Sequence, residues 1–207
     1  MNKSNRSCKD IIKSVILLSF LIVSSAYADR DFYDGQAQAN YYKNYSKAVS
    51  HFKKSLQYRI RKYKANHWKI SQIYNLLGHA YYKNLQFKLA ISALEKELYI
   101  EKQTKHFNGS SILSSDIFGR LGDAHRGAKN FKTAIRYYRK SLDHLVKRKG
   151  KNHPYEASIC VNIADTYQIR KRRKMAKKYY KQALAVEKES GELAKSTITR
   201  IKKYLSQ

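Results

Sequence analysis

Small residues recur along this chain with a period of just over forty positions. Four alanines are separated by 42, 44 and 42 residues, namely Ala48, Ala90, Ala134 and Ala176. Four residues after each alanine comes a large apolar side chain, in order Phe52, Leu94, Tyr138 and Tyr180. Positions four apart share one face of a helix. The pattern therefore predicts one amphipathic helix in each of four repeats.

A second pattern lies twelve residues before the last three alanines. It consists of Gly78, Gly122 and Ala164, each preceded by an aliphatic residue and followed three positions later by Tyr81, His125 or Tyr167. Glycine inside a helix costs about 1 kcal/mol relative to alanine. We therefore expect a first helix in each repeat, with a neighbouring helix too close at Gly78 and Gly122 for a Cβ. We expect the periodic alanines to form the other half of this contact, and the following large residue to fill the wider gap one turn later.

These motifs resemble the tetratricopeptide repeat. Tyr74-x-x-Leu77-Gly78-x-x-Tyr81 with Ala90-x-x-x-Leu94 is one copy, and equivalent copies begin at Phe118 and Cys160. The period of about 42 is similar to that of kinesin light chain repeats. The resemblance implies an all-α, right-handed superhelical solenoid of about four helical hairpins, over residues 30–64, 70–105, 114–149 and 155–190. Leu193, Ile198, Ile201 and Leu205 predict a capping helix over residues 192–206.

The first 28 residues have the features of a signal peptide. Four basic residues precede the apolar run Ser14–Ser25, and Ala26-Tyr27-Ala28 follows as a small-x-small cleavage site. The apolar run is shorter than the roughly 20 residues that span a bilayer, although an uncleaved anchor stays open as the alternative. We expect an exported protein, periplasmic or secreted and of bacterial type. Only Cys160 remains after cleavage, so no intramolecular disulfide can form.

The net charge of +28 is unevenly distributed. The predicted second helices carry 27 basic and six acidic residues, whereas the first helices carry six of each. In proteins of this resemblance, first helices line a concave groove and second helices form the convex back. We therefore expect a groove that is near neutral and a back that is strongly positive, which favours an acidic partner for the back. The high lysine content also fits an AT-rich genome, so the charge need not serve binding.

The first-helix register supplies candidate residues for a peptide groove. They are Tyr33, Tyr41, Asn75, His79, Tyr82, Lys83, Arg120, Asp123, Arg126, Asn162, Asp165 and Gln168. The resemblance implies that asparagines and basic residues on this face hold the backbone or carboxylate of an extended peptide, although no complete carboxylate clamp is visible. A solvated face without a dedicated partner is the alternative.

A basic patch is predicted on the back of the last repeat. It comprises Arg170, Arg172, Arg173, Lys174, Lys177, Lys178 and Lys181. The patch could bind a polyanion or an anionic membrane surface, but a charge run in a turn is more often simply solvated. The export signal argues against a nucleic-acid partner.

No motif for catalysis, a metal or a cofactor is present. The seven histidines are scattered, and neither a phosphate-binding glycine loop nor a nucleophile elbow occurs. Cys160 occupies a periodic buried position, where a thiol is normally inert. The sequence therefore predicts a non-enzymatic scaffold that binds a partner polypeptide in its groove. Polyanion or membrane binding through the basic helices is the alternative, and a structural adaptor within a larger assembly is a third hypothesis.

Overall fold

A computed structural model describes residues 13, 30–103, 112–191, 193 and 195–206. All regular secondary structure in these residues is helical, which confirms the expected all-α fold. The chain divides into two compact units, Met1–Lys64 and Ala65–Gln207. The predicted signal peptide and its cleavage site lie outside the described residues. Of the helices in the described ranges, none combines the length and the apolar character that a membrane span requires.

The first unit contains a helical hairpin. Residues 30–40 are helical, and α2 spans Tyr45–Lys62. Phe32 and Phe52 are buried between them, and the guanidinium of Arg59 lies 4.6 Å from the centre of the Phe32 ring. The side chain of Asn44 caps α2 by accepting a hydrogen bond from the amide of Lys47 at 3.1 Å.

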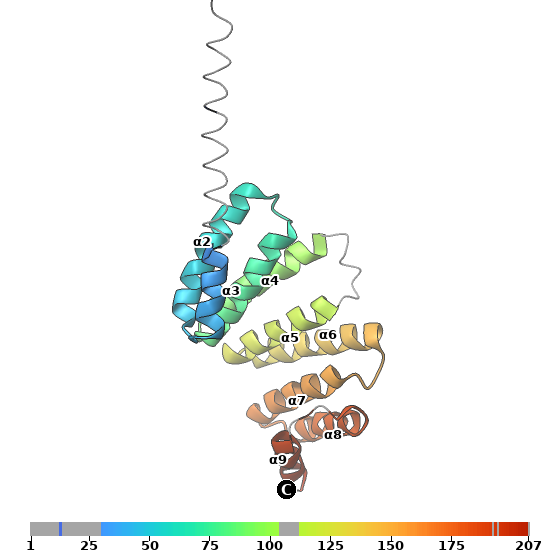
Figure 1. The fold of residues 1–207 in the computed structure, drawn as a ribbon. Helices are drawn as coiled ribbons and strands as arrows, with labels where there is room; N and C mark the ends of the chain where they lie inside the picture. The colour runs from blue at the N-terminus through green and yellow to red at the C-terminus, as the bar shows by residue number, and fades with distance from the viewer. Residues whose placement is uncertain (1–12, 14–29, 104–111, 192, 194, 207) are drawn as a thin grey trace, which may run out of the picture. The chain divides into compact units, whose positions relative to one another are not determined.

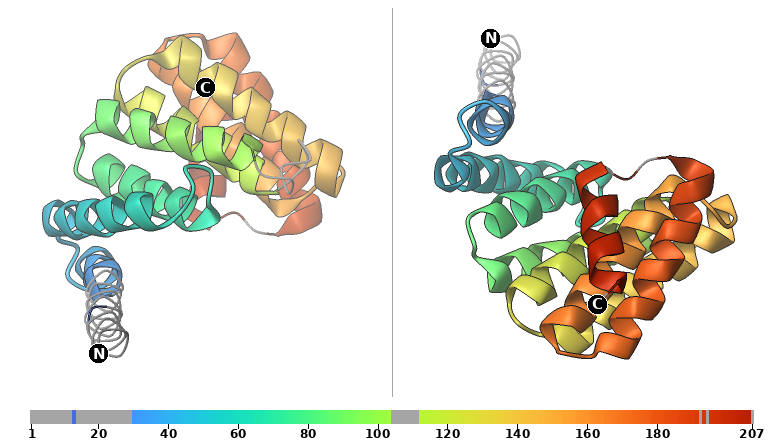
Figure 2. Two further views of the ribbon diagram at one scale, coloured as in Figure 1. Left: turned by 90° about the horizontal axis from the view of Figure 1, so that it is seen from above. Right: turned by 90° about the horizontal axis from the view of Figure 1, so that it is seen from below.

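The second unit contains three further hairpins and a final helix. The second hairpin pairs α3 (Trp68–Lys83) with α4 (Phe87–Gln103), and the third pairs α5 (Ile112–Gly127) with α6 (Phe131–Lys149). The fourth pairs α7 (Pro154–Ile169) with α8 (Arg173–Ser190), and α9 (Lys195–Leu205) follows. The helices of each hairpin lie side by side, and α4 contacts α5 as α6 contacts α7 (Figure 1). Figure 2 shows these three pairs from two other directions.

The turn inside each hairpin has the same backbone conformation. Lys43, Leu85, Lys129 and Lys171 all have a positive φ, between 53° and 61°. They are separated by 42, 44 and 42 residues, which is the spacing of the alanines. A left-handed residue allows the chain to reverse within a few positions, although side chains other than glycine adopt it rarely. The turn geometry therefore repeats, with lysine at three of the four positions and leucine at the other.

The core follows the predicted register. Ala48, Ala90, Ala134 and Ala176 are fully buried, as are the large residues four positions later. Ile70, Ile73, Leu121 and Ile163 complete the buried faces of the first helices.

The role expected for the large residues needs a correction. A Cβ built on Gly122 would lie 2.5 Å from Cδ1 of Tyr138, and one on Gly78 would lie 2.8 Å from Cδ2 of Leu94. At Gly78 the backbone of Ala90 is 3.8 Å away. The close contact at each glycine is thus made by the large residue of the same hairpin, and not by the periodic alanine. The alanine brings the helix near enough for that side chain to lie directly on the glycine.

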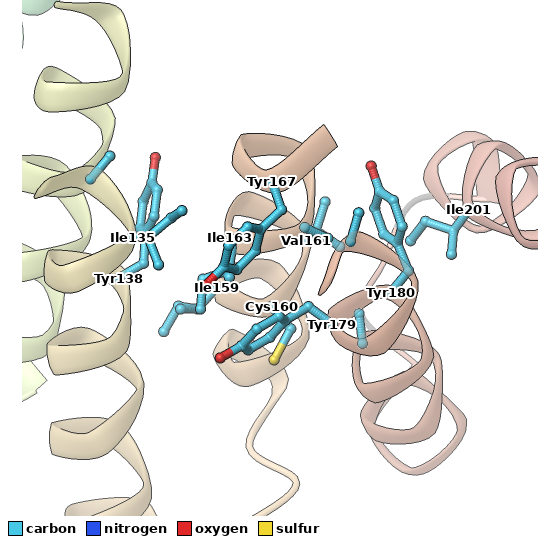
Figure 3. Packing of buried hydrophobic residues seen from close by; sticks show 14 of the residues in the cluster. Ile135, Tyr138, Ile159, Cys160, Val161, Ile163, Tyr167, Tyr179, Tyr180 and Ile201 are labelled. Carbon is cyan, nitrogen blue, oxygen red and sulfur yellow. The ribbon is translucent and has the colours of Figure 1, made fainter. Parts of the chain in front are cut away.

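The final helix covers the last hydrophobic face. Ile201 is fully buried within the cluster that includes Tyr180, Ala183 and Ala176. Figure 3 shows Ile201 beside the ring of Tyr180. The helix begins at Lys195, three residues after the predicted start at Glu192. It acts as a cap, because the apolar side of α8 would otherwise face solvent.

Candidate functional site

Ten of the twelve predicted groove residues lie on the first helices of the second unit. Asn75, His79, Tyr82 and Lys83 lie on α3; Arg120, Asp123 and Arg126 on α5; Asn162, Asp165 and Gln168 on α7. Tyr33 and Tyr41 belong to the first unit and are exposed, at 64% and 84%. The structure brings most of the ten into contact with one another through hydrogen bonds and shared pocket walls.

A hydrogen-bonded cluster joins α5 and α6 in the third hairpin. The hydroxyl of Tyr138 donates to Oδ1 of Asp123 at 2.6 Å, and Nη2 of Arg126 donates to the same oxygen at 3.0 Å. Nη1 of Arg126 also reaches Oδ1 of Asn162 on the next hairpin, at 3.2 Å. Burial raises the pKa of Asp123, although Tyr138 and Arg126 stabilise its charged form. We call Tyr138, Asp123 and Arg126 the third-hairpin cluster.

The fourth hairpin repeats this arrangement with one substitution. The hydroxyl of Tyr180 donates to Oδ1 of Asp165, and the side-chain amide of Gln168 lies within hydrogen-bond distance of the same hydroxyl, at 2.7 Å. Gln168 stands where the third hairpin has Arg126, so the arginine comes from elsewhere. Nη1 of Arg200, on the capping helix, donates to Oδ1 of Asp165 at 2.9 Å and to the Tyr180 hydroxyl at 3.2 Å. Tyr180, Asp165 and Arg200 form the fourth-hairpin cluster.

The second hairpin lacks such a cluster and has a pocket in its place. Leu94 stands where the third and fourth hairpins have a tyrosine, and His79 stands where they have an aspartate. A pocket of about 200 Å³ lies there, lined by Gly78, His79, Tyr82, Lys83, Leu94, Arg120 and Asp123. Because leucine has neither the ring nor the hydroxyl of tyrosine, the space that a phenol fills in the third hairpin stays open. We call this space the Leu94 pocket.

A buried carboxylate that was not predicted from the sequence pairs with Arg120, which lines the Leu94 pocket. The side chain of Glu97 on α4 is 2% exposed. Its Oε1 accepts from Nδ2 of Asn75 at 2.8 Å and from Nη2 of Arg120 at 3.1 Å. Arg120 also pairs with Asp116 at 2.9 Å. Burial raises the pKa of Glu97, although Arg120 and Asn75 oppose that shift.

A sequence signal for Glu97 existed in the register. The position seven residues after each periodic alanine holds Ser55, Glu97, Ser141 and Ala183, all of them buried. A glutamate among three small residues at a core position requires a cation close by. Oε2 of Glu97 and Nε of Arg120 have no hydrogen-bond partner within the described part of the chain.

A second pocket, of about 290 Å³, lies between the third and fourth hairpins. Ser115, Asp116, Gly119 and Ser141 line it from the third hairpin, and Tyr155, Ser158 and Asn162 from the fourth. Arg120 and Asp123 line this polar pocket as well as the Leu94 pocket. The two pockets therefore adjoin on α5, one mainly apolar and the other rich in hydroxyl and amide groups.

Most charges near the two pockets are already paired. Arg120 bonds to Glu97 and Asp116, Arg126 to Asp123 and Asn162, and Asn75 to Glu97. Asn75, Arg120, Arg126 and Asn162 were predicted to hold a peptide, and that role stays a prediction. The structure shows that each would have to share or exchange an internal hydrogen bond to perform it. Tyr82, His79 and Lys83 line the Leu94 pocket directly.

The predicted basic patch lies on the turn after α7 and along α8. Arg172, Arg173, Lys174, Lys178 and Lys181 are exposed, whereas Arg170 and Lys177 are partly buried. Elsewhere, burial raises the pKa of the Cys160 thiol to about 12, which keeps it protonated and unreactive near neutral pH. The residues that the structure describes contain no group of three or more side chains placed to hold a metal ion.

Comparison with known proteins agrees with this architecture. Residues 71–104 and 113–189 match the tetratricopeptide repeat family, and together they cover more than half of the chain. A kinesin light chain-related protein 3 from Arabidopsis thaliana is 32% identical over 95 residues. That match covers 46% of this chain, and the chain spans only 14% of the length of that relative.

Solved structures share the fold at low sequence identity. A Podospora anserina protein named for the kinesin light chain, with nearly identical TPR-like repeats, superposes with a TM-score of 0.68 at 16% identity, covering 90% of this chain and 92% of that one. BtubC from P. vanneervenii gives 0.60 at 18% identity, covering 89% and 81%. Aspartyl phosphate phosphatase F from Bacillus subtilis gives 0.70 at 16% identity, covering 87% and 45%.

Repeats of this family are typical of scaffolds that mediate protein–protein interaction. The glycine and alanine register, the paired helices and the matches to both repeat segments agree on one assignment. The chain belongs to the tetratricopeptide repeat family, with repeats of the kinesin light chain type.

Proposed function

We propose that this protein is an exported scaffold that binds an extended segment of a partner polypeptide across α3, α5 and α7. The observation that carries the proposal is the pair of adjoining pockets that share Arg120 and Asp123. An apolar side chain of the partner enters the Leu94 pocket. A neighbouring polar side chain of the partner then bonds to the serines and Asn162 of the polar pocket.

The rigidity of the surrounding helices supports this function. Glu97, Arg120, Asp116 and Asn75 are linked by hydrogen bonds, as are Asp123, Arg126 and Asn162. These bonds hold the pocket walls in place before a ligand arrives, so binding orders the peptide and not the receptor. The pockets carry few unpaired charges, which favours a partner segment with apolar and hydroxyl side chains over a highly charged one.

Peptide selection followed by filling of the pocket tests the proposal. A displayed library of random dodecapeptides is selected on residues 29–207, and enriched peptides are measured by fluorescence anisotropy. The double variant His79→Asp/Leu94→Tyr introduces the aspartate and the tyrosine of the third-hairpin cluster at the Leu94 pocket. We expect affinity to fall by at least about tenfold, which corresponds to about 1.4 kcal/mol, while the melting temperature is kept.

The control changes the charge of the chain at residues that line neither pocket. Lys53 and Lys54 are exposed on α2, in the first unit, and Lys53→Glu/Lys54→Glu should leave peptide affinity within about twofold. Failure to enrich any peptide, or equal affinity for the filled and original pockets, would refute the groove as the binding site.

Export is the second part of the proposal, and the predicted signal peptide supports it. Expression of the full chain in a bacterial host followed by N-terminal sequencing of the periplasmic or secreted product tests it. We expect the mature protein to begin at Asp29. Retention of Met1 in a membrane fraction would indicate an uncleaved anchor.

A further inference from the structure

A strongly basic pocket lies between α6 and the C-terminal end of α7, apart from the two pockets described above. Its volume is about 460 Å³. Lys132, Arg136, Arg139 and Lys140 line it from α6, and Arg170 lines it from the residue that ends α7. Asp143 is the one acidic residue in its lining, and it pairs with Lys147 at 3.0 Å. We call it the α6 pocket.

The spacing of the α6 cations places them on one helix face. Positions 132, 136 and 140 are successive i, i+4 neighbours, and they span about 12 Å at a rise of about 1.5 Å per residue. Like charges at this spacing repel one another and lower helix stability. An anion bound between them would remove that repulsion.

Arg139 is held in the α6 pocket without losing its charge. Its Nε donates to the hydroxyl of Tyr179 at 3.2 Å, and its Nη2 donates to the hydroxyl of Tyr167 at 2.9 Å. These partners are neutral phenols, whereas the arginines near the Leu94 pocket bond to carboxylates. The guanidinium is therefore fixed in position and its positive charge stays available to a ligand.

We propose that the α6 pocket binds an oligoanion that carries at least two phosphate or sulfate groups. Tetrahedral oxyanions suit forked guanidinium groups and ammonium groups. One such group is too small to contact cations spread over about 12 Å, whereas two or three linked groups reach all of them. The volume lies within the range of about 300–1,000 Å³ that is usual for small-molecule sites.

Calorimetric titration of residues 29–207 with inorganic tripolyphosphate tests the site. The variant Lys132→Glu/Arg136→Glu reverses two exposed charges that make no hydrogen bond among the described contacts. We expect it to weaken binding by at least about tenfold. The same titration with a sulfated heparin disaccharide distinguishes a sulfate-bearing ligand from a phosphate-bearing one, and tight binding of either supports the shared chemistry.

Two control variants change the net charge by the same amount elsewhere. Lys53→Glu/Lys54→Glu lies on α2, and Lys178→Glu/Lys181→Glu lies in the basic patch of α8. Each should weaken tripolyphosphate binding by no more than about twofold. Equal losses in all three variants would show general attraction to the positive chain and overturn the proposal.

Two further results would also overturn it. One is the absence of tripolyphosphate binding at 50 mM salt. The other is binding to phosphatidylglycerol vesicles without binding to tripolyphosphate, because a flat membrane surface does not enter a pocket. Circular dichroism of each variant checks that the helices are intact, so a loss of binding is assigned to the charges.

Discussion

The second and third hairpins share one backbone arrangement, yet they differ in the side chains that lie beside the helix glycine. In the third hairpin a tyrosine lies on the helix glycine, and its hydroxyl is held by Asp123. In the second hairpin a leucine lies on the equivalent glycine, and a pocket takes the place of the phenol. The difference shows how a pocket can open in a repeat array. In the second hairpin, Leu94 keeps the contact with the helix glycine, but the phenol that fills the neighbouring space in the third hairpin is absent.

The partner of each buried carboxylate differs in the same way. Asp123 is bonded within its own hairpin, by Tyr138 and Arg126. Glu97 depends on Asn75 and on Arg120 of the next hairpin. Asp123 is therefore held within a single repeat, with Arg126 reaching the next one through Asn162, whereas the carboxylate of Glu97 itself joins two repeats.

The largest difference between the two hairpins should appear when their glycines become alanine. Gly122→Ala places a methyl group 2.5 Å from the ring of Tyr138, which Asp123 holds in place. We expect a loss of about 1–3 kcal/mol in the free energy of unfolding, measured by urea denaturation. Gly78→Ala should cost less, because Leu94 can turn toward the empty pocket. Equal costs would mean that the pocket provides no room for rearrangement.

Gly119→Ala is the matched control on the same helix. Its Cβ would meet only Oγ of Ser141, at an ordinary 3.5 Å. Since alanine favours a helix over glycine by about 1 kcal/mol, this variant should be at least as stable as the parent chain. A loss comparable to that of Gly122→Ala would show that crowding is not the cause.

Removing the tyrosine hydroxyl comes next in size. Tyr138→Phe leaves the partly buried Asp123 without its shortest hydrogen bond while Arg126 stays in place. We expect a destabilisation of about 1–2 kcal/mol. Tyr81→Phe is a suitable comparison in the second hairpin, where no carboxylate holds the ring. If thermal melting shows the two variants to be equally stable, the cluster adds nothing beyond packing.

Loss of the arginine from the cap should have a smaller effect. Arg200 is 48% exposed at its side chain, so water screens its bond to Asp165. Arg200→Ala should lower the free energy of unfolding by only about 0.2–1 kcal/mol. Arg126→Ala removes the less exposed counterpart in the third hairpin, at 24%, and should cost more. The reverse order in denaturant titrations would assign a larger structural role to the cap.

The smallest effect concerns pH and the buried glutamate. Burial raises the folded-state pKa of Glu97 above its unfolded value of 4.5, so the folded chain holds this proton more tightly. The proton-linked contribution of Glu97 is therefore present below pH 4.5 and is lost as pH rises through the folded pKa. Relative to Glu97→Gln, the parent chain should become less stable as pH rises above 4.5. Parallel curves of unfolding free energy against pH would contradict this direction.

Packing was the part of the fold that the sequence predicted best. Burial of the four alanines and of Tyr138 and Tyr180 follows from their spacing alone, because a small residue and a large one four positions later must share a buried face. The contact between Gly122 and Tyr138 within one hairpin did not follow, since the spacing says which residues are buried and not which of them touch.

The polar groups of the site were harder to predict. The first-helix register placed Asp123 and Arg126 correctly on α5, but gave no indication that they were already bonded to each other. Glu97 was missed because charged residues on second helices were treated as solvated. The left-handed backbone conformation at Leu85 and Lys129 could not be predicted from the sequence, since neither residue type favours it. Each pocket is bounded by side chains from two neighbouring hairpins, so the residue pattern of a single repeat does not predict it.

The origin of Arg200 has a consequence for lengthening this protein. A duplicated copy of the third hairpin would bring its own Arg126 for Asp123, so an inserted unit would be electrostatically complete. A duplicated copy of the fourth hairpin would lack such an arginine. The partner of Asp165 is Arg200 on α9, and α9 follows only the last copy. An internal Asp165 would then face Gln168 alone. Elongation should thus succeed by copying residues 112–153 and should require a Gln168→Arg change when residues 154–191 are copied instead.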